Sequence, residues 1–362
     1  MGGHARIHCQ IPIHRAEVYR EGGFDPGFFG VIGVTEVREA GLALSVIIAV
    51  LNAERDLPAC LESIRRQRPP GGGYEIVIAE GGSSDATRAI AEAAGARVVN
   101  NPERKAEPGY AFAVQASRGR FVTVMAADNR MVGEDFMERM LEPFADNAVV
   151  AAFPRVVSTA KDGLAGRYFN RYSDPFNHFV YGSLNTSIDL MLRARKSRLR
   201  PTVENHPLLA IAQGCTFRTG LVYQGPPAEA DDVLAVINLI EQGGEFALVA
   251  GAELEHHHVS GGATIYRKYW RRTAEALGGE QGYLRRKGKL TRARRLRRWL
   301  WVPYSASLIL PAVHGALLAA RHRDPLLLYH PFVNTVLFAA VLRGAGERLI
   351  SGSRSTPVRS TG

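Results

Sequence analysis

The sequence predicts an α/β fold built on a mostly parallel sheet. Apolar runs at 42–50, 74–80 and 121–125 are typical of strands that are buried on both faces. An amphipathic helical segment at 54–67 lies between the first and second runs, and another at 83–95 follows the second run. Strands that alternate with helices in this way imply right-handed crossovers and parallel neighbours.

The elements of this half follow in order along the chain. Residues 1–41 lack clear periodicity and are assigned no function. The helix at 54–67 places Leu57, Cys60, Leu61 and Ile64 on one face. The helix at 83–95 begins with serines that suit an N-cap and ends at Gly95. A short strand at 96–100 and a helical stretch at 108–118 lead to the strand at 121–125.

The second half continues the same sheet. We expect a strand at 148–157, helical aromatic segments over 163–200, and a strand and loop at 208–220. A helix at 229–244 directs Val233, Val236, Ile237 and Ile240 to the core, and 245–258 is a strand pair or one extended run. The predicted divisions are an irregular extension (1–41), an α/β domain (42–262), a basic helical linker (263–298), an apolar helical hairpin (299–343) and a disordered tail (344–362).

Composition describes an ordinary folded protein. The chain has 362 residues, of which 46% are hydrophobic and 22% charged. Its three cysteines, Cys9, Cys60 and Cys215, form no CxxC pair, which favours a reducing compartment over a disulfide framework or a zinc–cysteine site. The first 40 residues contain no long apolar core, so no signal peptide is expected.

The net charge of +10 is concentrated near the C-terminus. Residues 285–298 hold nine Lys or Arg and no acid, and an apolar stretch from Trp299 to Ala320 follows directly. As a helix this stretch would be about 33 Å long, enough to cross a hydrocarbon core. Its aromatic residues and the preceding arginines suit a cytoplasmic membrane face.

The apolar stretches at 299–320 and 325–342 favour a helical hairpin that spans the membrane or re-enters it. Pro303, Pro311 and His314 interrupt a clean span, and the alternative is a soluble helical pair that covers the sheet. No nucleic-acid partner is expected, because the arginines adjoin apolar helices instead of interleaved aromatic residues.

The strand at 121–125 delivers a single carboxylate, Asp128, to its end. In open α/β sheets ligands bind just beyond the carboxyl ends of the strands. Asp128 is therefore a candidate functional residue, although a solvated acid at the start of a loop is the simpler alternative. Asn129 and Arg130 follow it and could add phosphate contacts.

Several segments in order resemble the family 2 glycosyltransferases, which have the GT-A fold. "LSVIIAVLNAERDLPACLESIRRQ" is similar to the opening strand and helix of that family, and "EIVIAEGGSSDATRAIA" to its second strand and following signature. "GRFVTVMAADNRM" resembles the strand that carries an Asp-x-Asp motif, "AQGCTFRTG" the acceptor-side segment, and "EADDVLAVINLIEQGG" the Glu-Asp helix. The resemblance covers roughly residues 42–260.

The resemblance implies a set of donor-binding residues. They would grip the base, ribose and diphosphate of a nucleotide-sugar: Asn52, Glu54, Glu80, Ser83, Asp85, Lys105 and Asp128. Arg104 is a further candidate for a phosphate contact. For Ser83 and Asp85, capping of the following helix is the structural alternative. The chain departs from the family at Glu80, which stands in place of an Asp, and at Ala126, which replaces the first acid of the Asp-x-Asp.

The resemblance also implies Mg²⁺ or Mn²⁺ as a cofactor. A divalent ion held by Asp128 and the two phosphates would neutralise the departing nucleoside diphosphate, and such ions need only one or two protein carboxylates. The run His256–His258 could supply another ligand. His256 and His258 share a face of an extended strand, and His258 is the residue we select.

The same resemblance assigns the catalytic base to the acidic pair Asp231 and Asp232, with Asp232 as the base. It would accept the proton of the acceptor hydroxyl as that oxygen attacks the sugar; the alternative is a favourable helix N-terminus. Arg218 and Gly214 are expected on the acceptor or phosphate side. The aromatic residues of 172–182 are given no role.

These features predict a membrane-associated enzyme that moves one sugar from a nucleotide donor to a lipid-linked or other membrane-proximal glycan acceptor, with inversion. No Gln-x-x-Arg-Trp motif of processive synthases is present. Because Ala126 removes one acid, the alternative is a catalytically impaired sugar-nucleotide binding or scaffold protein. A nucleotidyltransferase is disfavoured, since no Gly-rich basic loop follows the first strand.

Overall fold

Three strongly apolar strands form the centre of the first half of the sheet. A computed structural model of the chain describes residues 41–172, 174–181, 197–202, 211–230, 232–257, 261–277 and 292–352, all within the unit Arg38–Gly362. Strands β1 (Leu44–Val50), β2 (Tyr74–Glu80) and β4 (Phe121–Met125) are almost completely buried, as continuous apolar runs predict. With β3 (Arg97–Asn100) they pair in parallel in the order β3-β2-β1-β4.

The other half of the sheet is mixed. Its order continues β4-β8-β6-β9-β5, where β8 is Gln213–Arg218, β6 is Val149–Val157, β9 is Glu245–His256 and β5 is Asn129–Met131. Strand β8 runs antiparallel to both β4 and β6, and β6 runs parallel to β9. A two-residue strand, β7 (Arg198–Leu199), pairs with β9. The α/β fold class is confirmed, with parallel pairing concentrated in the first half.

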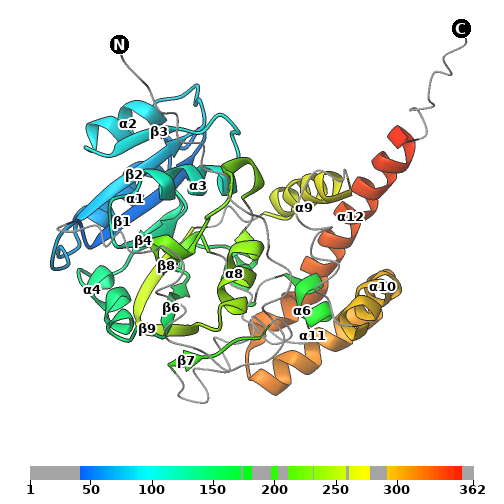
Figure 1. Ribbon diagram of the computed structural model, residues 1–362. Helices are drawn as coiled ribbons and strands as arrows, with labels where there is room; N and C mark the ends of the chain where they lie inside the picture. The colour runs from blue at the N-terminus through cyan, green and yellow to red at the C-terminus, as the bar shows by residue number, and fades with distance from the viewer. Residues whose placement is uncertain are drawn as a thin grey trace, which may run out of the picture. The chain divides into compact units, whose positions relative to one another are not determined.

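Helices cover both faces of this sheet (Figure 1). One core packs the sheet against α3 (Ala106–Ala116) and α8 (Asp232–Glu241). The other core packs it against α1 (Leu57–Arg65), α2 (Thr87–Ala93) and α4 (Phe136–Leu141), and a 3₁₀ turn, η2 (Glu142–Ala145), follows α4. Two further 3₁₀ turns, η3 (Thr219–Leu221) and η4 (Pro227–Glu229), connect β8 to α8. The sheet is therefore the middle of three layers.

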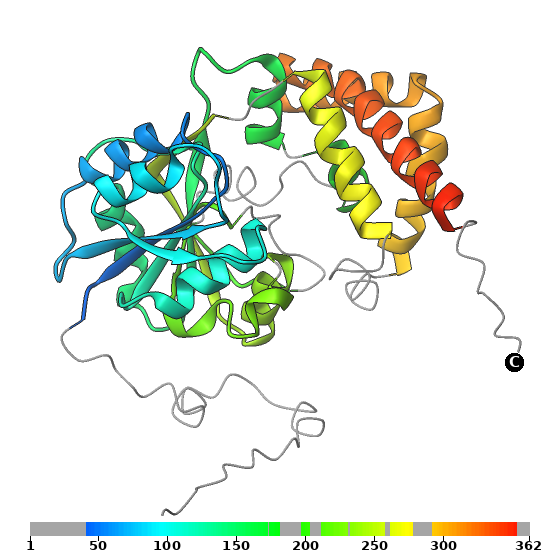
Figure 2. The ribbon, with the colours of Figure 1, turned by 90° about the horizontal axis from the view of Figure 1, so that it is seen from above.

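Helices from two parts of the chain gather beside the sheet layers (Figure 2). Helices α5 (Leu164–Tyr172) and α6 (Pro175–Tyr181) follow β6, and α9 (Gly262–Leu277) follows β9. They pack with α10 (Arg292–Ala306), α11 (Ile309–His322), the 3₁₀ turn η6 (Pro325–Tyr329) and α12 (His330–Gly352).

The apolar stretch 299–320 is not one straight helix. Helix α10 ends at Ala306, α11 begins at Ile309, and the two axes differ by 105°. Pro311 lacks the N–H that would bond one turn back to Ser307, and Leu308 has a positive φ of 56°. Both features break the helix at this point. Among the described residues, only Pro325–Glu347 is both long and apolar enough to cross a membrane without such a break.

Candidate functional site

The candidate site lies at the edge where the parallel strands end. Val50 at the end of β1 pairs with Glu80 at the end of β2, and Ile48 pairs with Met125 at the end of β4. Because these strands run in the same direction, the loops that follow them emerge at one edge of the sheet. Glu80 and Asp128 are therefore brought to the same edge, as their positions after apolar strands predict.

Two of these loops are joined by their own side chains. The N–H of Asn52 donates to Ser83 Oγ (2.9 Å), and the N–H of Glu54 donates to Asp85 Oδ2 (3.2 Å). In return, the N–H of Ala86 donates to Glu54 Oε2 (3.0 Å). Asn52 also adopts a left-handed backbone, with φ 52°. These four residues, expected to bind a donor, thus bind one another and fix the shape of the edge.

Glu80 stabilises the loop that follows β2. Its side chain is buried, Oε1 accepts from the N–H of Ser83 (2.6 Å), and Oε2 lies 3.5 Å from the Arg88 guanidinium. Burial raises the pKa of Glu80, but hydrogen bonds from Ser83 and Gly82 and the charge of Arg88 outweigh it, so the pKa lies below its usual value. The carboxylate is therefore ionised, and it already accepts a hydrogen bond from the loop that follows β2.

Two cations lie beyond the third strand, which ends at the same edge. Lys105 is exposed immediately before α3. Arg104 has a positive φ of 55°, and its Nη1 lies 3.7 Å from the position that a Cβ would take on Gly82. Their charge is thus available next to the two joined loops.

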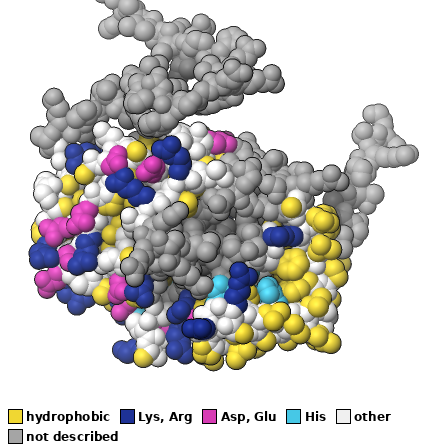
Figure 3. Space-filling model, turned by 90° about the horizontal axis from the view of Figure 1, so that it is seen from below, with side chains coloured by type: hydrophobic (Ala, Val, Ile, Leu, Met, Phe, Trp, Pro, Cys, Tyr) yellow, Lys and Arg dark blue, Asp and Glu magenta, His cyan; other side chains and the backbone are white. Residues whose placement is uncertain are grey.

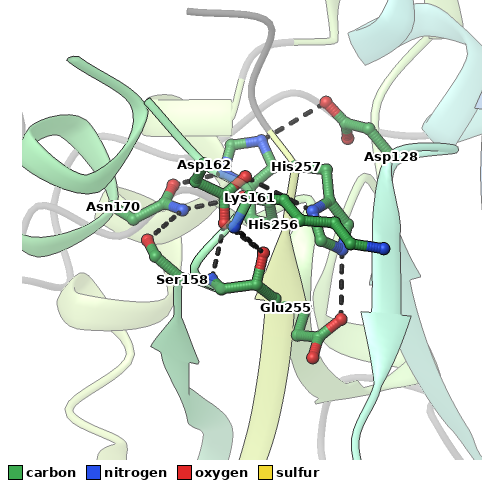
Figure 4. Close-up of polar contacts among 9 residues, drawn as sticks. Asp128, Ser158, Lys161, Asp162, Asn170, Glu255, His256 and His257 are labelled. Carbon is green, nitrogen blue, oxygen red and sulfur yellow. Dashed lines mark hydrogen bonds and ion pairs between the residues drawn. The ribbon is translucent and has the colours of Figure 1, made fainter. Parts of the chain in front are cut away.

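Asp128 faces a histidine from the last strand of the sheet. Strand β5 pairs with β9 so that Asn129 is opposite His256, and the N–H of His257 donates to the Asp128 carbonyl (3.0 Å). This register brings His256 Nε2 to 3.4 Å from Asp128 Oδ2 (Figure 4). The histidine beside Asp128 is therefore His256; His258, which the sequence analysis selected, lies outside the described residues.

Two amides orient the His256 ring. Asn170 on α5 donates through Nδ2 to Ser158 Oγ (2.9 Å) and to the His256 carbonyl (2.7 Å), which leaves its Oδ1 at 2.8 Å from His256 Nδ1. Gln213 Nε2 lies at 2.8 Å from the same ring nitrogen. Asn170 supports the tautomer with a hydrogen on Nδ1, and Gln213 supports the other. The ring can therefore present either a lone pair or an N–H to Asp128.

Neither amide was identified from the sequence. Asn170 stands within an aromatic helical segment and Gln213 before a small-residue strand, and nothing in either pattern indicates contact with a histidine more than 40 positions away. The position of α5 brings Asn170 to His256, and the register shift of β8 against β4 brings Gln213 to it.

His257 turns away from Asp128. Its Nδ1 lies 3.3 Å from Asp162 Oδ1 and its Nε2 lies 3.0 Å from Glu255 Oε2, so it is held by two carboxylates of its own (Figure 4). Within the described ranges, no group of three or more His, Cys, Asp or Glu is arranged to hold a metal ion. Any metal at Asp128 and His256 would therefore need further ligands other than the His, Cys, Asp and Glu side chains of these ranges.

Asp232 is the first residue of α8, which packs on one face of the sheet. Its carboxylate accepts a hydrogen bond from the Tyr223 hydroxyl. Burial raises the pKa of Tyr110 well above its usual value, and the carboxylates of Asp232, Glu107 and Asp128 raise it further. Asp232 and Asp128, which lie on different elements, thus both disfavour ionisation of the Tyr110 hydroxyl. Asp231 lies outside the described residues.

Gly214 lies in a β-bulge near the end of β4. The register of β4 with β8 shifts between Val124 and Met125, which pair with Cys215 and Gln213, so that Gly214 is the extra residue. Its φ is 75°, and a Cβ would lie 3.2 Å from Phe136. Glycine is required by the backbone here, which places Gln213 next to His256.

Arg218 lies at the opposite edge of the sheet, contrary to the expectation of a phosphate contact. It pairs with Phe121 at the start of β4 because β8 runs antiparallel to that strand. Its guanidinium donates to the carbonyls of Val149, Phe144 and Asp146 at 3.1–3.2 Å. Arg218 therefore stabilises the opposite edge of the sheet and lies away from the candidate site.

Parts of the chain are similar to known glycosyltransferases. Residues 45–199 match the model of glycosyl transferase family 2. EpsH of Bacillus subtilis (strain 168), which is named as a glycosyltransferase, is 30% identical over 149 residues, which are 38% of this chain and 42% of EpsH. The glucosyl-3-phosphoglycerate synthase of Mycolicibacterium smegmatis is 26% identical over 220 residues, 56% of this chain and 71% of that protein.

A solved structure shares the fold. The mannosyltransferase PcManGT from Pyrobaculum calidifontis, in complex with GDP-Man and Mn²⁺, superposes with a TM-score of 0.50 at 16% identity, covering 85% of this chain and 87% of that one. The match with EpsH spans less than half of that protein. Residues 45–199 therefore match glycosyl transferase family 2, and the chain has the GT-A fold, with β1, β2, β3 and β4 as its parallel strands.

Proposed function

We propose that this protein is a glycosyltransferase that moves a single sugar from a nucleotide-sugar donor to a lipid-linked or other membrane-proximal acceptor. The observation that carries the proposal is the pair Asp128 and His256, 3.4 Å apart at the sheet edge where ligands bind. The match to that family supplies the reaction class, and the complexes named for its relatives support a nucleotide-sugar as donor.

A divalent cation, Mg²⁺ or Mn²⁺, fits this pair. Two neighbouring ligands of an octahedral ion lie about 3.0 Å apart, given metal–oxygen distances near 2.1 Å. The measured separation of 3.4 Å between Asp128 Oδ2 and His256 Nε2 is close to this value. Asn170 accepts from Nδ1 in the tautomer that leaves Nε2 unprotonated, as a metal-bound histidine requires. With two protein ligands, the donor diphosphate and water would complete the coordination.

When bound, the ion offsets the charge of the departing nucleoside diphosphate. Asp232 is proposed as the base that accepts the acceptor proton, and Tyr223 holds its carboxylate in place. A direct attack by the acceptor oxygen opposite the leaving group would invert the anomeric centre. Glu80, Lys105 and Arg104 are proposed to face the donor, from the loops that Asn52, Glu54, Ser83 and Asp85 hold together.

The division into a catalytic domain at 42–262 and a C-terminal helical part also remains a proposal. The apolar character of α11 and α12 supports attachment to the cytoplasmic face of a membrane, where a lipid-linked acceptor would be presented.

Ala126 motivates the alternative, a protein of the same fold that binds a sugar-nucleotide without turnover. Hydrolysis of a panel of nucleotide-sugars by detergent-solubilised protein, with and without Mn²⁺, separates the two. We expect Mn²⁺-dependent release of nucleoside diphosphate from one donor and its loss in Asp128→Ala. Binding of a donor with no release would favour the alternative, and turnover that Asp128→Ala leaves unchanged would refute the metal site.

A further inference from the structure

The exposed surface of the C-terminal helices is largely apolar. Along α11, Ile309, Leu310, Val313 and Leu317 are each more than half exposed, and no charged residue occurs between Ile309 and Ala320. The opposite face of α11 is already packed, because Pro311, Gly315 and Ala319 are buried. A helix that is apolar on both its packed and its exposed face is typically buried further, against another molecule or a membrane.

The apolar surface continues around the bend. On α10, Trp299 is 78% exposed, and Leu296, Leu300 and Val302 are exposed beside it. Figure 3 shows apolar side chains gathered over this part of the molecule, with Lys and Arg at the border. We call the exposed residues of α10 and α11, 296–317, the apolar elbow.

Arginines stand at both ends of the apolar elbow. Arg297 is exposed at its start, and Arg321 and Arg323 are exposed just after its end. The described residues from 292 to 323 contain no acid. This arrangement suits a lipid leaflet with anionic headgroups. The apolar side chains would enter the hydrocarbon, and the arginines at both ends and the exposed tryptophan would lie among the headgroups.

Helix α12 is long enough to span a bilayer, but its neighbour is not compatible with hydrocarbon. Helix α9 lies along it: a Cβ on Gly262 would lie 3.3 Å from Phe332, and one on Gly344 would lie 3.0 Å from Thr273. At the far end, Trp270 Nε1 donates to Glu347 Oε2 (2.7 Å).

Over that shared length α9 carries charge. Arg267 and Arg271 are exposed on it, and Lys268 is half-buried. If α12 crossed the bilayer in this packing, these cations would enter the hydrocarbon, at a cost of several kcal/mol. Helix α11 is also too short to cross alone, since 14 residues measure about 21 Å against about 30 Å of hydrocarbon.

We infer that the apolar elbow enters one leaflet of an anionic membrane without crossing it, so that the sheet and the end of α12 stay on the same side. This inference specifies how the membrane attachment in the proposed function is made. It rests on that attachment and not on sugar transfer. Both can therefore be tested separately, because vesicle binding is measured without donor or acceptor.

The first experiment is flotation of the full chain with vesicles of phosphatidylglycerol and phosphatidylcholine. We expect Ile309→Asp combined with Leu317→Asp to lower the bound fraction by at least about tenfold, since each change replaces an exposed apolar side chain that would enter the leaflet with a charged one. Leu164→Asp, at a residue 51% exposed on α5, is the matched control and retains binding. Circular dichroism confirms that each variant is folded.

The second experiment places a reactive cysteine at Ile350, which is 61% exposed near the end of α12. The background carries Cys9→Ser, and the remaining Cys60 and Cys215 are buried. In vesicles that bind the protein from outside, a membrane-impermeant maleimide should label Ile350→Cys as fast as it does without vesicles. Protection of that cysteine would show a crossing and overturn the inference. Unchanged flotation of the double Asp variant would also overturn it, as would a dimer in vesicle-free solution that the double variant abolishes.

Discussion

A side chain at the centre of the site, His256, receives its orientation from a residue on a different element. Asn170 donates to the His256 carbonyl and to Ser158, so its amide oxygen is turned towards His256 Nδ1. Partners of this kind tune both the basicity and the direction of a metal-binding imidazole. The strength of the proposed metal site therefore depends on α5 as well as on β5 and β9.

Removing this partner gives the first prediction. We expect Asn170→Ala to lower Mn²⁺ affinity by about 10–100-fold in the presence of a nucleoside diphosphate, and His256→Ala to lower it further. Isothermal titration calorimetry measures the affinity without turnover. His257→Ala is the matched control, because that imidazole is held by Asp162 and Glu255 and should leave Mn²⁺ binding unchanged. Equal losses in all three variants would contradict a specific role for His256.

Asp232 gives the second prediction at this scale. In Asp232→Asn the side chain still accepts from Tyr223 but no longer takes a proton, so kcat should fall by about 10²–10⁴-fold. Donor affinity, measured by calorimetry, should change little. If the variant instead weakens donor binding and keeps its kcat, Asp232 is a binding residue and another group is the base.

At the scale of elements, the loops after β1 and β2 act as one unit. Thr87 is fully buried at the start of α2, and its hydroxyl accepts from the N–H of Ala53 (2.7 Å) and donates to Asp85. The edge of the site is thus shaped by contacts between loops about 30 residues apart. It does not depend on either loop alone.

Thr87→Val tests this unit. The change keeps the volume but leaves the N–H of Ala53 without its acceptor, so we expect a loss of about 1–3 kcal/mol in the free energy of unfolding. Urea denaturation measures it. Thr335→Val, at an exposed hydroxyl on α12, is the control and should cost less than about 0.5 kcal/mol. A similar loss in both variants would show that the contact between the loops is not the cause.

The length and composition of each strand decided how much of the sheet and the site could be predicted from the sequence. Strands β1, β2 and β4 are continuous apolar runs, so their existence, their parallel pairing and the place of Asp128 at an end were predictable. Strand β5 has three residues and no periodicity, yet its register with β9 selects His256. Arg218 was misplaced because a sequence does not reveal that β8 runs antiparallel to β4.

At the scale of the whole molecule, the sheet and the C-terminal helices are joined through α5 and α6. Tyr168 on α5 lies 2.7 Å from His330 Nδ1, while Asn170 on the same helix contacts His256. Arg171 Nε lies 2.8 Å from Asp324. One helix therefore connects the candidate metal site to the helices that carry the apolar elbow.

This junction encloses two histidines that stay neutral. Burial and, to a smaller extent, the neighbouring imidazoles lower the pKa of His330 to about 3, and the same two causes lower the pKa of His178 to about 3. In the unfolded chain each titrates near 6.5. The unfolded state therefore binds more protons below pH 6.5, so stability is fully present above that pH and is lost as the pH falls towards 3.

The expected outcome is an acid-sensitive helical junction. Each histidine should remove about 1.4 kcal/mol of unfolding free energy for every pH unit below 6.5. Urea denaturation between pH 7.5 and 5.0, followed by tryptophan fluorescence, to which the buried Trp301 contributes, measures the slope. His330→Phe should reduce that slope by about 1.4 kcal/mol per pH unit even if it lowers stability at every pH. In contrast, Ile64→Val, in the core of the sheet, should lower stability without changing the slope. A slope that His330→Phe leaves intact would mean that other groups cause the acid sensitivity, and that the junction between α5 and α12 is not its origin.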